Sequence, residues 1–252
     1  MYEYDEEFYR YISENSARSA RKLLPVLREV LPLELESVLD VGCGAGAWLS
    51  VWKSYGMQVL GLDGGYVQPE QLLVSPEEFQ SADLSEEFDL GRRFSLVQSL
   101  EVAEHLPESS AAGFVASLCR HADLVLFSAA PPGQGGENHI NEQPYGYWQQ
   151  LFQAQGYSLY DVVRPRVKQE QAIMPWYRYN TFLYANDHSP ALLRDALASF
   201  ALPVGEPVPD LSPAIYRIRK HLVRLLPGAA STALARIKKT LHLTRSRLMG
   251  NG

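Results

Sequence analysis

Two carboxylates and an imidazole lie close together in the stretch L-E-V-A-E-H-L-P at 100–107. An apolar run that we expect to be a buried strand precedes them, so they should lie just beyond the carboxyl edge of a sheet. On one helical turn Glu101, Glu104 and His105 would face the same side. Carboxylate oxygens supplemented by histidine can hold a divalent metal ion. A second histidine, His139, follows the next apolar run, and adjacent strands would bring the two loops together.

A glycine-rich turn occurs earlier, in the stretch S-V-L-D-V-G-C-G-A-G at 37–46. Its apolar part, 38–41, is typical of a buried parallel strand. Gly42, Gly44 and Gly46 have no side chains, so a ligand can lie against the backbone, and they tolerate turn angles that other residues resist. An apolar segment of helical character follows. Strand, turn and helix start together predict a nucleotide-type cradle at the edge of a sheet.

Three acidic residues accompany this turn. Asp40 lies inside the strand just before the glycines, where an ammonium group is a better neighbour than a phosphate. Asp63 ends the apolar run 58–62 and is placed to accept hydrogen bonds from ribose hydroxyls. Asp83 follows another segment at the sheet edge. A ligand with an amino-acid end, a ribose and an adenine fits these acids better than NAD does, which disfavours a NAD-dependent oxidoreductase.

The motifs V-L-D-V-G-C-G-A-G, G-L-D and A-D-L resemble the cofactor motifs of class I S-adenosylmethionine (SAM)-dependent methyltransferases. The resemblance covers the chain from Tyr2 to Asn186. It implies that the glycine loop holds the methionine part of SAM, that Asp63 holds the ribose and that Asp83 meets the adenine amino group. The cofactor-binding residues that we expect are Asp40, Gly42, Cys43, Gly44, Gly46, Asp63, Ala82, Asp83, Leu84 and Leu100.

The pattern Glu-x-x-Glu-His with a later histidine resembles metal-assisted O-methyltransferases, such as those of small RNA and of ubiquinone biosynthesis. The resemblance implies that Glu101, Glu104, His105 and His139 bind Mg²⁺ or another divalent metal ion, which lowers the pKa of a substrate hydroxyl. Glu101, His105 and His139 are the catalytic residues that we expect. Two alternatives stay open. The site could be metal-free, with His105 or His139 as general base, or structural, with Glu101 only capping the cofactor pocket.

Strand-like and helix-like segments alternate along the chain, which predicts an α/β fold with a doubly wound, mainly parallel sheet. Together with the resemblance, this indicates a seven-stranded, Rossmann-like methyltransferase fold whose edge strand is antiparallel. The loops 131–144 and 164–180 lack regular periodicity, as binding loops often do. The expected strands lie at 38–41, 58–62, near 78–80, at 94–99, 124–128, 157–163 and 181–185, and the expected helices at 2–31, 47–55, 109–121 and 147–155.

The first helix carries Tyr2, Tyr4, Tyr9 and Tyr11. These tyrosines could pack the helix on the sheet. Alternatively, the segment could form a lid over cofactor and substrate, as it does in many related methyltransferases.

The chain divides into a methyltransferase domain at 1–188, including the N-terminal lid helix, and a basic helical C-terminal appendage at 189–252. From Ser212 onward there are nine Lys or Arg and no Asp or Glu, so the other residues hold 14 basic and 29 acidic groups. An acidic body disfavours nucleic acid as a partner. The appendage could pack on the body or on a partner protein, lie on an anionic membrane surface, dimerise or stay disordered.

Composition points to an ordinary globular protein, with 46% hydrophobic and 21% charged residues. The N-terminus lacks the basic and apolar regions of a secretory signal, and no uncharged apolar run reaches the ~20 residues that a membrane span needs. Cys43 and Cys119 give no disulfide framework. We therefore expect a cytoplasmic location.

These observations predict an enzyme that moves a methyl group from SAM to a hydroxyl of a small molecule or sugar. Because the sulfonium is already a good methyl donor, the protein need only align the acceptor, exclude water and deprotonate the oxygen. Two other functions are compatible with the same motifs: N- or C-methylation without a metal, and a SAM-binding scaffold in a biosynthetic assembly.

Overall fold

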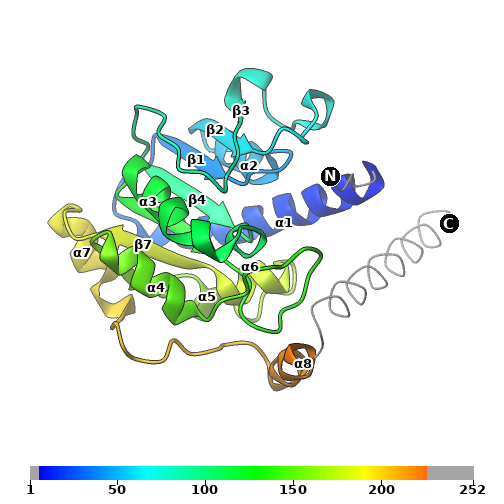
Figure 1. Ribbon diagram of the computed structural model, residues 1–252. Helices are drawn as coiled ribbons and strands as arrows, with labels where there is room; N and C mark the ends of the chain where they lie inside the picture. The colour runs from blue at the N-terminus through cyan, green and yellow to red at the C-terminus, as the bar shows by residue number, and fades with distance from the viewer. Residues whose placement is uncertain (1–5, 226–252) are drawn as a thin grey trace.

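The computed structural model describes residues 6–225, with side chains from residue 12 onward. An eight-stranded sheet in the order β3-β2-β1-β4-β5-β7-β6-β8 carries helices on both faces (Figure 1). The strands from β1 to β5 are parallel, whereas β7 pairs antiparallel with β5 and β6, and β8 pairs antiparallel with β6. The strands are β1 (Ser37–Val41), β2 (Gln58–Asp63), β3 (Phe79–Ser81), β4 (Leu96–Leu100), β5 (Leu124–Ser128), β6 (Tyr157–Tyr160), β7 (Phe182–Asn186) and β8 (Ala201–Leu202). The α-helices are α1 (Glu6–Val30), α2 (Ala47–Ser54), α3 (Ala111–His121), α4 (Tyr145–Ala154), α5 (Arg164–Val167), α6 (Pro175–Asn180), α7 (Ala191–Leu197) and α8 (Ala214–Arg224).

The predicted doubly wound α/β fold is confirmed, and each of the seven expected strands occurs. β6 ends at Tyr160 rather than at 163, and the loop expected at 164–180 contains the short helices α5 and α6. The eighth strand, β8, lies in the segment that we assigned to the appendage. Its residues pair with Leu159 and Tyr160, and the preceding helix α7 buries Leu193 and Leu197. The chain from α7 to β8 therefore packs with the sheet.

Two hydrophobic cores lie on opposite faces of the sheet because successive residues of a strand point to opposite sides. In β5, Leu124 and Leu126 contribute to the core beneath α1, α2, α5, α6 and α7, whereas Val125 and Phe127 contribute to the core beneath α3 and α4. The central strands are buried on both sides, which explains their nearly continuous apolar sequences.

α1 packs along one face of the sheet beside α2. Its apolar residues Leu23, Leu24 and Leu27 are fully buried. Nearer the start of the helix, the Ser16 hydroxyl bonds the Tyr177 hydroxyl at 3.0 Å. Tyr2 and Tyr4 lie outside the described residues, as do the side chains of Tyr9 and Tyr11. Packing by these tyrosines and the lid interpretation therefore both stay predictions.

The polar groups of interest gather at one edge of the sheet. β1 lies between β2 and β4, and the chain continues from it first to one side and then to the other. This is a topological switch point, where ligands of open α/β sheets bind beyond the carboxyl ends of the strands. The antiparallel strand β7 begins at this edge, since Phe182 pairs with Phe127 near the end of β5.

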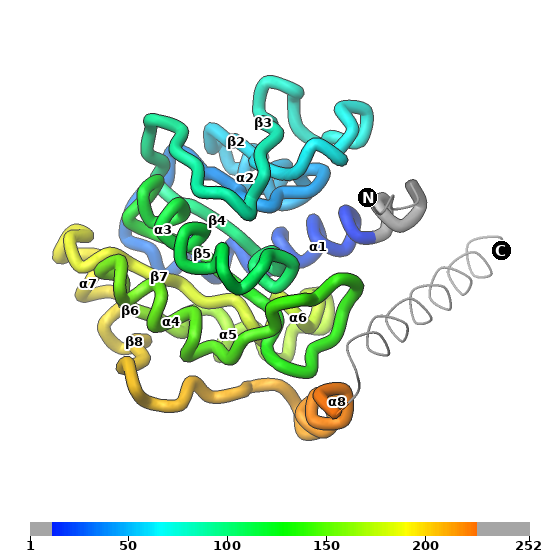
Figure 2. The backbone as a smooth tube through the Cα atoms, viewed as in Figure 1, coloured from blue at the N-terminus to red at the C-terminus, as the bar shows by residue number. Residues whose placement is uncertain are grey.

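After β8 the chain crosses the body and reaches α8, which lies at the periphery (Figure 2). The rest of the predicted appendage, from residue 226 on, lies outside the described residues. No helix between residues 6 and 225 combines the length and apolar character needed to cross a membrane.

Candidate active site

The glycine turn after β1 has the conformation that its sequence predicts. Gly42, Gly44 and Gly46 all have positive φ angles, of 82°, 53° and 80°, which side chains resist. A Cβ atom at Gly42 would lie 2.2 Å from the Val102 side chain, so that glycine is needed for packing. A Cβ atom at Gly44 would meet no atom within 4 Å. The turn therefore leaves open space over Gly44, where a ligand can lie against the backbone.

Asp63, at the end of β2, holds this turn in place. Its carboxylate accepts hydrogen bonds from the backbone N–H of Gly44 at 2.6 Å and of Gly64 at 2.7 Å, and from the Tyr66 hydroxyl. Burial raises the pKa of Asp63, and these three hydrogen bonds counteract the rise by stabilising the charged form. A carboxylate anchored in this way is suited to accept hydrogen bonds from ribose hydroxyls.

Asp40 lies in β1 directly before the glycines and is only 3% exposed. Burial raises its pKa to about 7, although the Gln98 side-chain amide lowers it. The Trp52 indole in turn donates to the Gln98 oxygen at 3.0 Å, which fixes the amide. No basic side chain is bonded to Asp40 among the described residues, so a cationic ligand would relieve the cost of its burial.

Cofactor binding should therefore depend on pH. An ammonium group requires ionised Asp40, so binding below pH 7 must release a proton. We expect the dissociation constant for S-adenosylhomocysteine to rise about 25-fold from about pH 7.5 to about pH 5.5. Calorimetry over this range measures the change. In the matched variant Asp40→Asn, binding should be weaker and should lose this dependence. If the variant kept the same slope, another group would be titrating.

The other predicted cofactor residues lie around this turn and along the same edge. Cys43 is buried in the turn and donates its S–H to the Gly44 carbonyl oxygen at 3.4 Å. Leu84 and Leu100 are buried, and the Ala82 N–H donates to the Asp63 carbonyl at 2.8 Å. Asp83 is exposed, and its carboxylate accepts hydrogen bonds from the backbone and side chain of Ser85, which lower its pKa. Its availability at the surface is compatible with contact to an adenine amino group.

Glu101, directly after β4, has a positive φ angle of 60°, which is rare for a residue other than glycine. Its N–H donates to the Ser128 carbonyl at 2.9 Å. Its carboxylate accepts from Gln134 Nε2 at 2.6 Å and from Asn180 Nδ2 at 3.2 Å. Burial raises the pKa of Glu101, and hydrogen bonds from Gln134, Asn180 and Ser128 oppose the rise.

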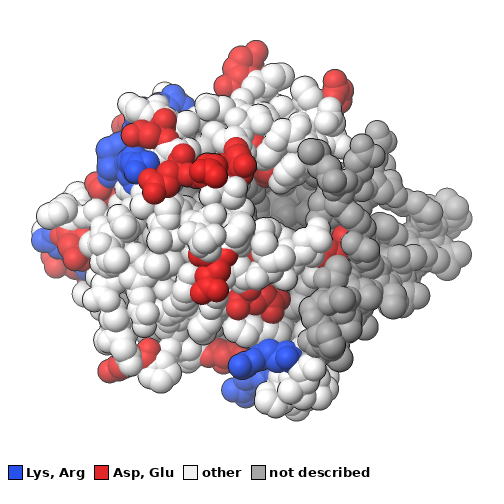
Figure 3. Space-filling model, viewed as in Figure 1, with Lys and Arg blue, Asp and Glu red and all other residues white. Residues whose placement is uncertain are grey.

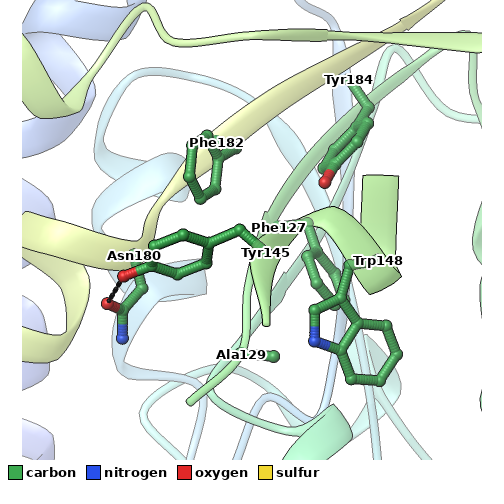
Figure 4. A pocket seen from close by; sticks show the side chains of 7 residues that line it. All are labelled: Phe127, Ala129, Tyr145, Trp148, Asn180, Phe182 and Tyr184. Atoms are coloured by element: carbon green, nitrogen blue, oxygen red, sulfur yellow. Dashed lines mark hydrogen bonds between the residues drawn. The ribbon is translucent and has the colours of Figure 1, made fainter. Parts of the chain in front are cut away.

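Asn180 connects this network to an aromatic cluster beneath α4. Figure 4 shows the Tyr145 hydroxyl directed at Asn180, to which it donates at 2.9 Å. Asn180 also donates to the Gln134 side-chain oxygen at 2.7 Å. The small pocket drawn there is lined by Phe127, Ala129, Tyr145, Trp148, Asn180, Phe182 and Tyr184. The position of the Glu101 carboxylate is thus fixed by its hydrogen bond with Asn180, which is itself held by Tyr145.

The structure brings together Glu104, His105 and His139, each of which offers one ligand atom within 4.8 Å of the others. The sequence predicted that Glu101, Glu104 and His105 share one helical turn. This is wrong, because the turn there, the 3-10 helix η3 (Ala103–His105), begins after Glu101. Of the four residues implied as metal ligands, Glu101 is thus outside this cluster. Its carboxylate is directed at Gln134 and Asn180 instead.

Glu104 is fully buried, and neither of its carboxylate oxygens has a well-formed hydrogen bond. Burial raises its pKa well above the usual value, and repulsion from Glu101 and Glu142 raises it further, whereas nearby backbone N–H groups oppose the rise. A buried carboxylate in this situation is protonated or is compensated by a cation.

The two imidazoles are oriented by hydrogen bonds at Nδ1. His105 Nδ1 lies 3.3 Å from the Asn138 carbonyl oxygen, and His139 Nδ1 lies 2.8 Å from a Glu142 oxygen. Hydrogen bonds and the charge of His139 lower the pKa of Glu142 despite its partial burial, so it accepts the proton of His139 Nδ1. Desolvation and repulsion from His139 lower the pKa of His105 to about 4. With Nδ1 as the donor in both hydrogen bonds, the neutral form of each imidazole has its lone pair on Nε2, the atom that would serve as metal ligand or general base.

Three residues of this site were not predicted. Gln134 and Glu142 lie in the long loop 131–144, whose length and lack of periodicity indicate a functional or a disordered loop, but no motif distinguishes them from its other polar residues. Asn180 precedes β7 and reaches Glu101 only through the antiparallel insertion of that strand. A polar residue two positions before a strand that starts at the binding edge is the only signal that the sequence offers for it.

Strand order, glycine turn and buried acids together define the class: a SAM-dependent methyltransferase with a Rossmann-like fold. SAM is the cofactor of this class, and the space over Gly44, the buried Asp40 and the anchored Asp63 suit its methionine and ribose parts. Residues 10–164, more than half of the chain, match the family described as "Methyltransferase domain". The chain belongs to this family.

Similar proteins were found by sequence and by structure. A ubiquinone biosynthesis O-methyltransferase of Methylobacterium nodulans is 31% identical over an alignment of 101 residues, and the match covers 36% of this chain and 39% of that relative's length. The sugar N-methyltransferase KedS8 of Streptoalloteichus has a similar structure (TM-score 0.53, 20% identity, 71% of this chain and 91% of that one). So does SAM-bound CalS10, an amino pentose methyltransferase of Micromonospora echinaspora (TM-score 0.53, 16% identity, 74% and 98%).

Proposed function

We propose that this enzyme transfers the methyl group of SAM to a hydroxyl of a small molecule or sugar, and that a divalent metal ion at Glu104, His105 and His139 assists the transfer. One observation carries the proposal. A fully buried carboxylate without a well-formed hydrogen bond lies beside two imidazoles, and each of the three residues offers a ligand atom within 4.8 Å of the others. Leaving such a carboxylate charged and unpaired is costly, and a bound cation would compensate for it.

The donor set favours particular ions. Magnesium prefers an octahedral shell of oxygens, whereas imidazole nitrogen suits first-row transition ions. One carboxylate and two imidazoles therefore favour Mn²⁺, Fe²⁺ or Zn²⁺ over Mg²⁺. When bound, the ion would act as a Lewis acid that lowers the pKa of an acceptor hydroxyl.

The chain's own residues align and shield the reactants. The glycine turn, Asp40 and Asp63 would hold the cofactor at the carboxyl end of β1, next to β4 and its cluster of ligands. The conformation of the loop 131–144, which carries His139, is fixed by Glu142. Its carboxylate accepts hydrogen bonds from the backbone N–H groups of Gly133 and Gly135, both at 2.7 Å. A loop held this firmly would exclude water and position the acceptor, which is most of what methyl transfer requires.

A metal-free mechanism is the second candidate for O-methylation. His139 pairs with Glu142, which orients the imidazole and would stabilise its protonated form after proton transfer. His105, with a pKa of about 4, is neutral at pH 7 but is a weak base. His139 is therefore the better general base of the two if no ion binds.

The similar proteins bear on the class of acceptor. The sequence match to a ubiquinone biosynthesis O-methyltransferase favours oxygen as the methylated atom. The names of the two structurally similar enzymes favour sugars, and that of KedS8 favours nitrogen as the methylated atom. An amine acceptor would not need an ionised hydroxyl and gives the metal no evident role. The predominantly acidic body is a poor surface for nucleic acid, which leaves small molecules as the better acceptors.

An acceptor screen with isotope-labelled SAM tests the proposal. We expect a catechol or a sugar diol to gain one labelled methyl group on oxygen when Mn²⁺ is present, and the rate to fall at least about 100-fold with EDTA. Mass-spectrometric fragmentation identifies the methylated atom. A labelled amino sugar formed equally fast with EDTA would instead establish metal-free N-methylation. SAM binding without transfer to any acceptor would favour the scaffold function.

A further inference from the structure

Helix α8 exposes an apolar surface that the body does not cover. Ten large apolar side chains are exposed in the described part of the chain, and five of them lie in α8 or directly after it. Of these five, the four that are most exposed recur at helical spacing and so form one stripe along the helix. They are Ile215 (74%), Ile218 (61%), Leu222 (59%) and Leu225 (72%). We call these four residues the apolar stripe.

The opposite side of α8 attaches it to the body. Val223 is buried, and the Tyr216 ring lies 6.0 Å from that of Tyr179. Lys220 forms an ion pair with Asp210, and Arg219 donates to the Gln134 carbonyl at 3.1 Å. These contacts orient the helix so that the apolar stripe faces away from the body.

Basic residues lie on the solvent side of the helix, beyond one edge of the apolar stripe. At 100° per residue His221 follows Leu225 around the helix, and the exposed Arg217 and Arg224 lie beyond His221, about 80–100° from Leu225. In Figure 3 basic atoms lie beside an uncharged patch at the lower edge of the molecule, where Figure 1 places α8. No acidic residue occurs in the sequence from Ser212 to the C-terminus. The helix is thus basic, whereas the body is predominantly acidic.

We propose that α8 docks this enzyme on an anionic lipid membrane, with the apolar stripe buried in the interface and Arg217 and Arg224 at the headgroups. An exposed apolar face combined with exclusively basic charge is the pattern of helices that lie in the plane of a bilayer. An anionic bilayer matches both properties at once, whereas a second copy of this chain would oppose the basic side with equal charge.

The position of α8 relates docking to the site. A Cβ atom at Gly133 would lie 2.0 Å from the Lys220 carbonyl oxygen, so the loop 131–144 touches the helix backbone. Gln134 receives the Arg219 hydrogen bond on its backbone and bonds Glu101 with its side chain. Docking through α8 would therefore place the loop over the candidate site at the bilayer surface. This last step rests on the proposed function, whereas membrane docking itself does not.

Sedimentation of the full chain with lipid vesicles tests docking. We expect binding to vesicles of phosphatidylcholine and phosphatidylglycerol, little binding to phosphatidylcholine alone, and weaker binding at high salt. Ile218→Asp or Leu222→Asp should reduce binding about tenfold or more. Leu192→Asp is the matched control, because Leu192 is also 61% exposed but lies on α7. Arg217→Glu should weaken binding, whereas Arg92→Glu, an equal charge change at an exposed site before β4, should not.

Three results would overturn docking: no binding to anionic vesicles, equal binding by the Ile218→Asp and Leu192→Asp proteins, or self-association that Leu222→Asp abolishes in place of vesicle binding. Affinity for S-adenosylhomocysteine, measured in parallel without vesicles, should be unchanged in the α8 variants. A failure of docking therefore leaves the methyltransferase proposal standing, and a failure of the acceptor screen leaves docking standing.

Discussion

Replacing Gly44 by valine should abolish binding of S-adenosylhomocysteine and leave the protein folded. A side chain at this position would enter the open space over the turn, where no atom lies within 4 Å of a Cβ position. The backbone at Gly44 is also left-handed, with φ 53°, which valine resists, so part of any effect could be strain. The experiment needs a control that has the same strain but no ligand nearby.

Gly91 provides that control. It also has a positive φ angle, of 64°, and nothing within 4 Å of a Cβ position, but it precedes β4 at the opposite edge of the sheet. Gly91→Val should lower the melting temperature about as much as Gly44→Val and should bind S-adenosylhomocysteine as tightly as the unmodified chain. If both variants lost binding equally, strain rather than obstruction would be the cause.

Asp63→Ala should give the same loss of binding for a different reason. The ribose would lose its acceptors, and the N–H groups of Gly44 and Gly64 and the Tyr66 hydroxyl would lose the carboxylate that fixes the turn. Hydrogen bonds to a charged group contribute about 1.5–3 kcal/mol each, so losing two weakens binding at least about 100-fold. Calorimetry measures this loss, and unchanged affinity would contradict the placement of the cofactor.

Most of the cofactor site follows from local sequence. The strands are buried on both faces and therefore read as short apolar runs, and alternate glycines mark the turn after the first of them. Asp40 and Asp63 occur within or at the end of such runs, so their place at one edge of the sheet could be predicted. Because β1, β2 and β4 are parallel, their carboxyl ends lie at the same edge of the sheet, and this brings the residues that follow them together.

The ligand cluster depends on features that local sequence does not encode. Glu101 adopts a left-handed conformation, which has no sequence signal in a non-glycine residue, and its carboxylate lies outside the cluster of Glu104, His105 and His139. Its partners Gln134 and Asn180 are 33 and 79 residues away. The two-residue strand β8 is likewise too short to produce a periodic pattern. These arrangements arise from tertiary packing, so they emerge only once the sheet is assembled.

Replacing Glu104 by glutamine should remove a divalent ion from the protein without affecting SAM binding. The change preserves shape but takes away the negative charge that a cation needs, and first-row ions bind amide oxygen poorly. We expect the unmodified chain to bind one equivalent of Mn²⁺ or Zn²⁺ and Glu104→Gln to lose at least about 100-fold in affinity, because removing an outer-shell partner alone typically costs 10–100-fold. Calorimetric titration and elemental analysis measure both.

A graded series separates ligands from supporting residues. His139→Ala should match Glu104→Gln. Glu142→Gln should cost about 10–100-fold, since Glu142 is not a proposed ligand but orients His139 through Nδ1 and accepts the N–H groups of Gly133 and Gly135. Glu101→Gln decides the remaining question. In the unmodified chain Glu101 bonds Gln134 and Asn180 and lies outside the cluster, so Glu101→Gln should retain the ion. Loss of the ion in this variant would show that Glu101 is a fourth ligand.

The stability of the Glu104→Gln protein gives an independent readout. In the free protein a glutamine removes the buried carboxylate and its repulsion from Glu101, so without metal the variant should be at least as stable as the unmodified chain near pH 7. With metal the order should reverse, because only the unmodified chain gains binding energy from the ion. A melting temperature that metal leaves unchanged in both proteins would exclude the site and make His139, oriented by Glu142, the base to test next.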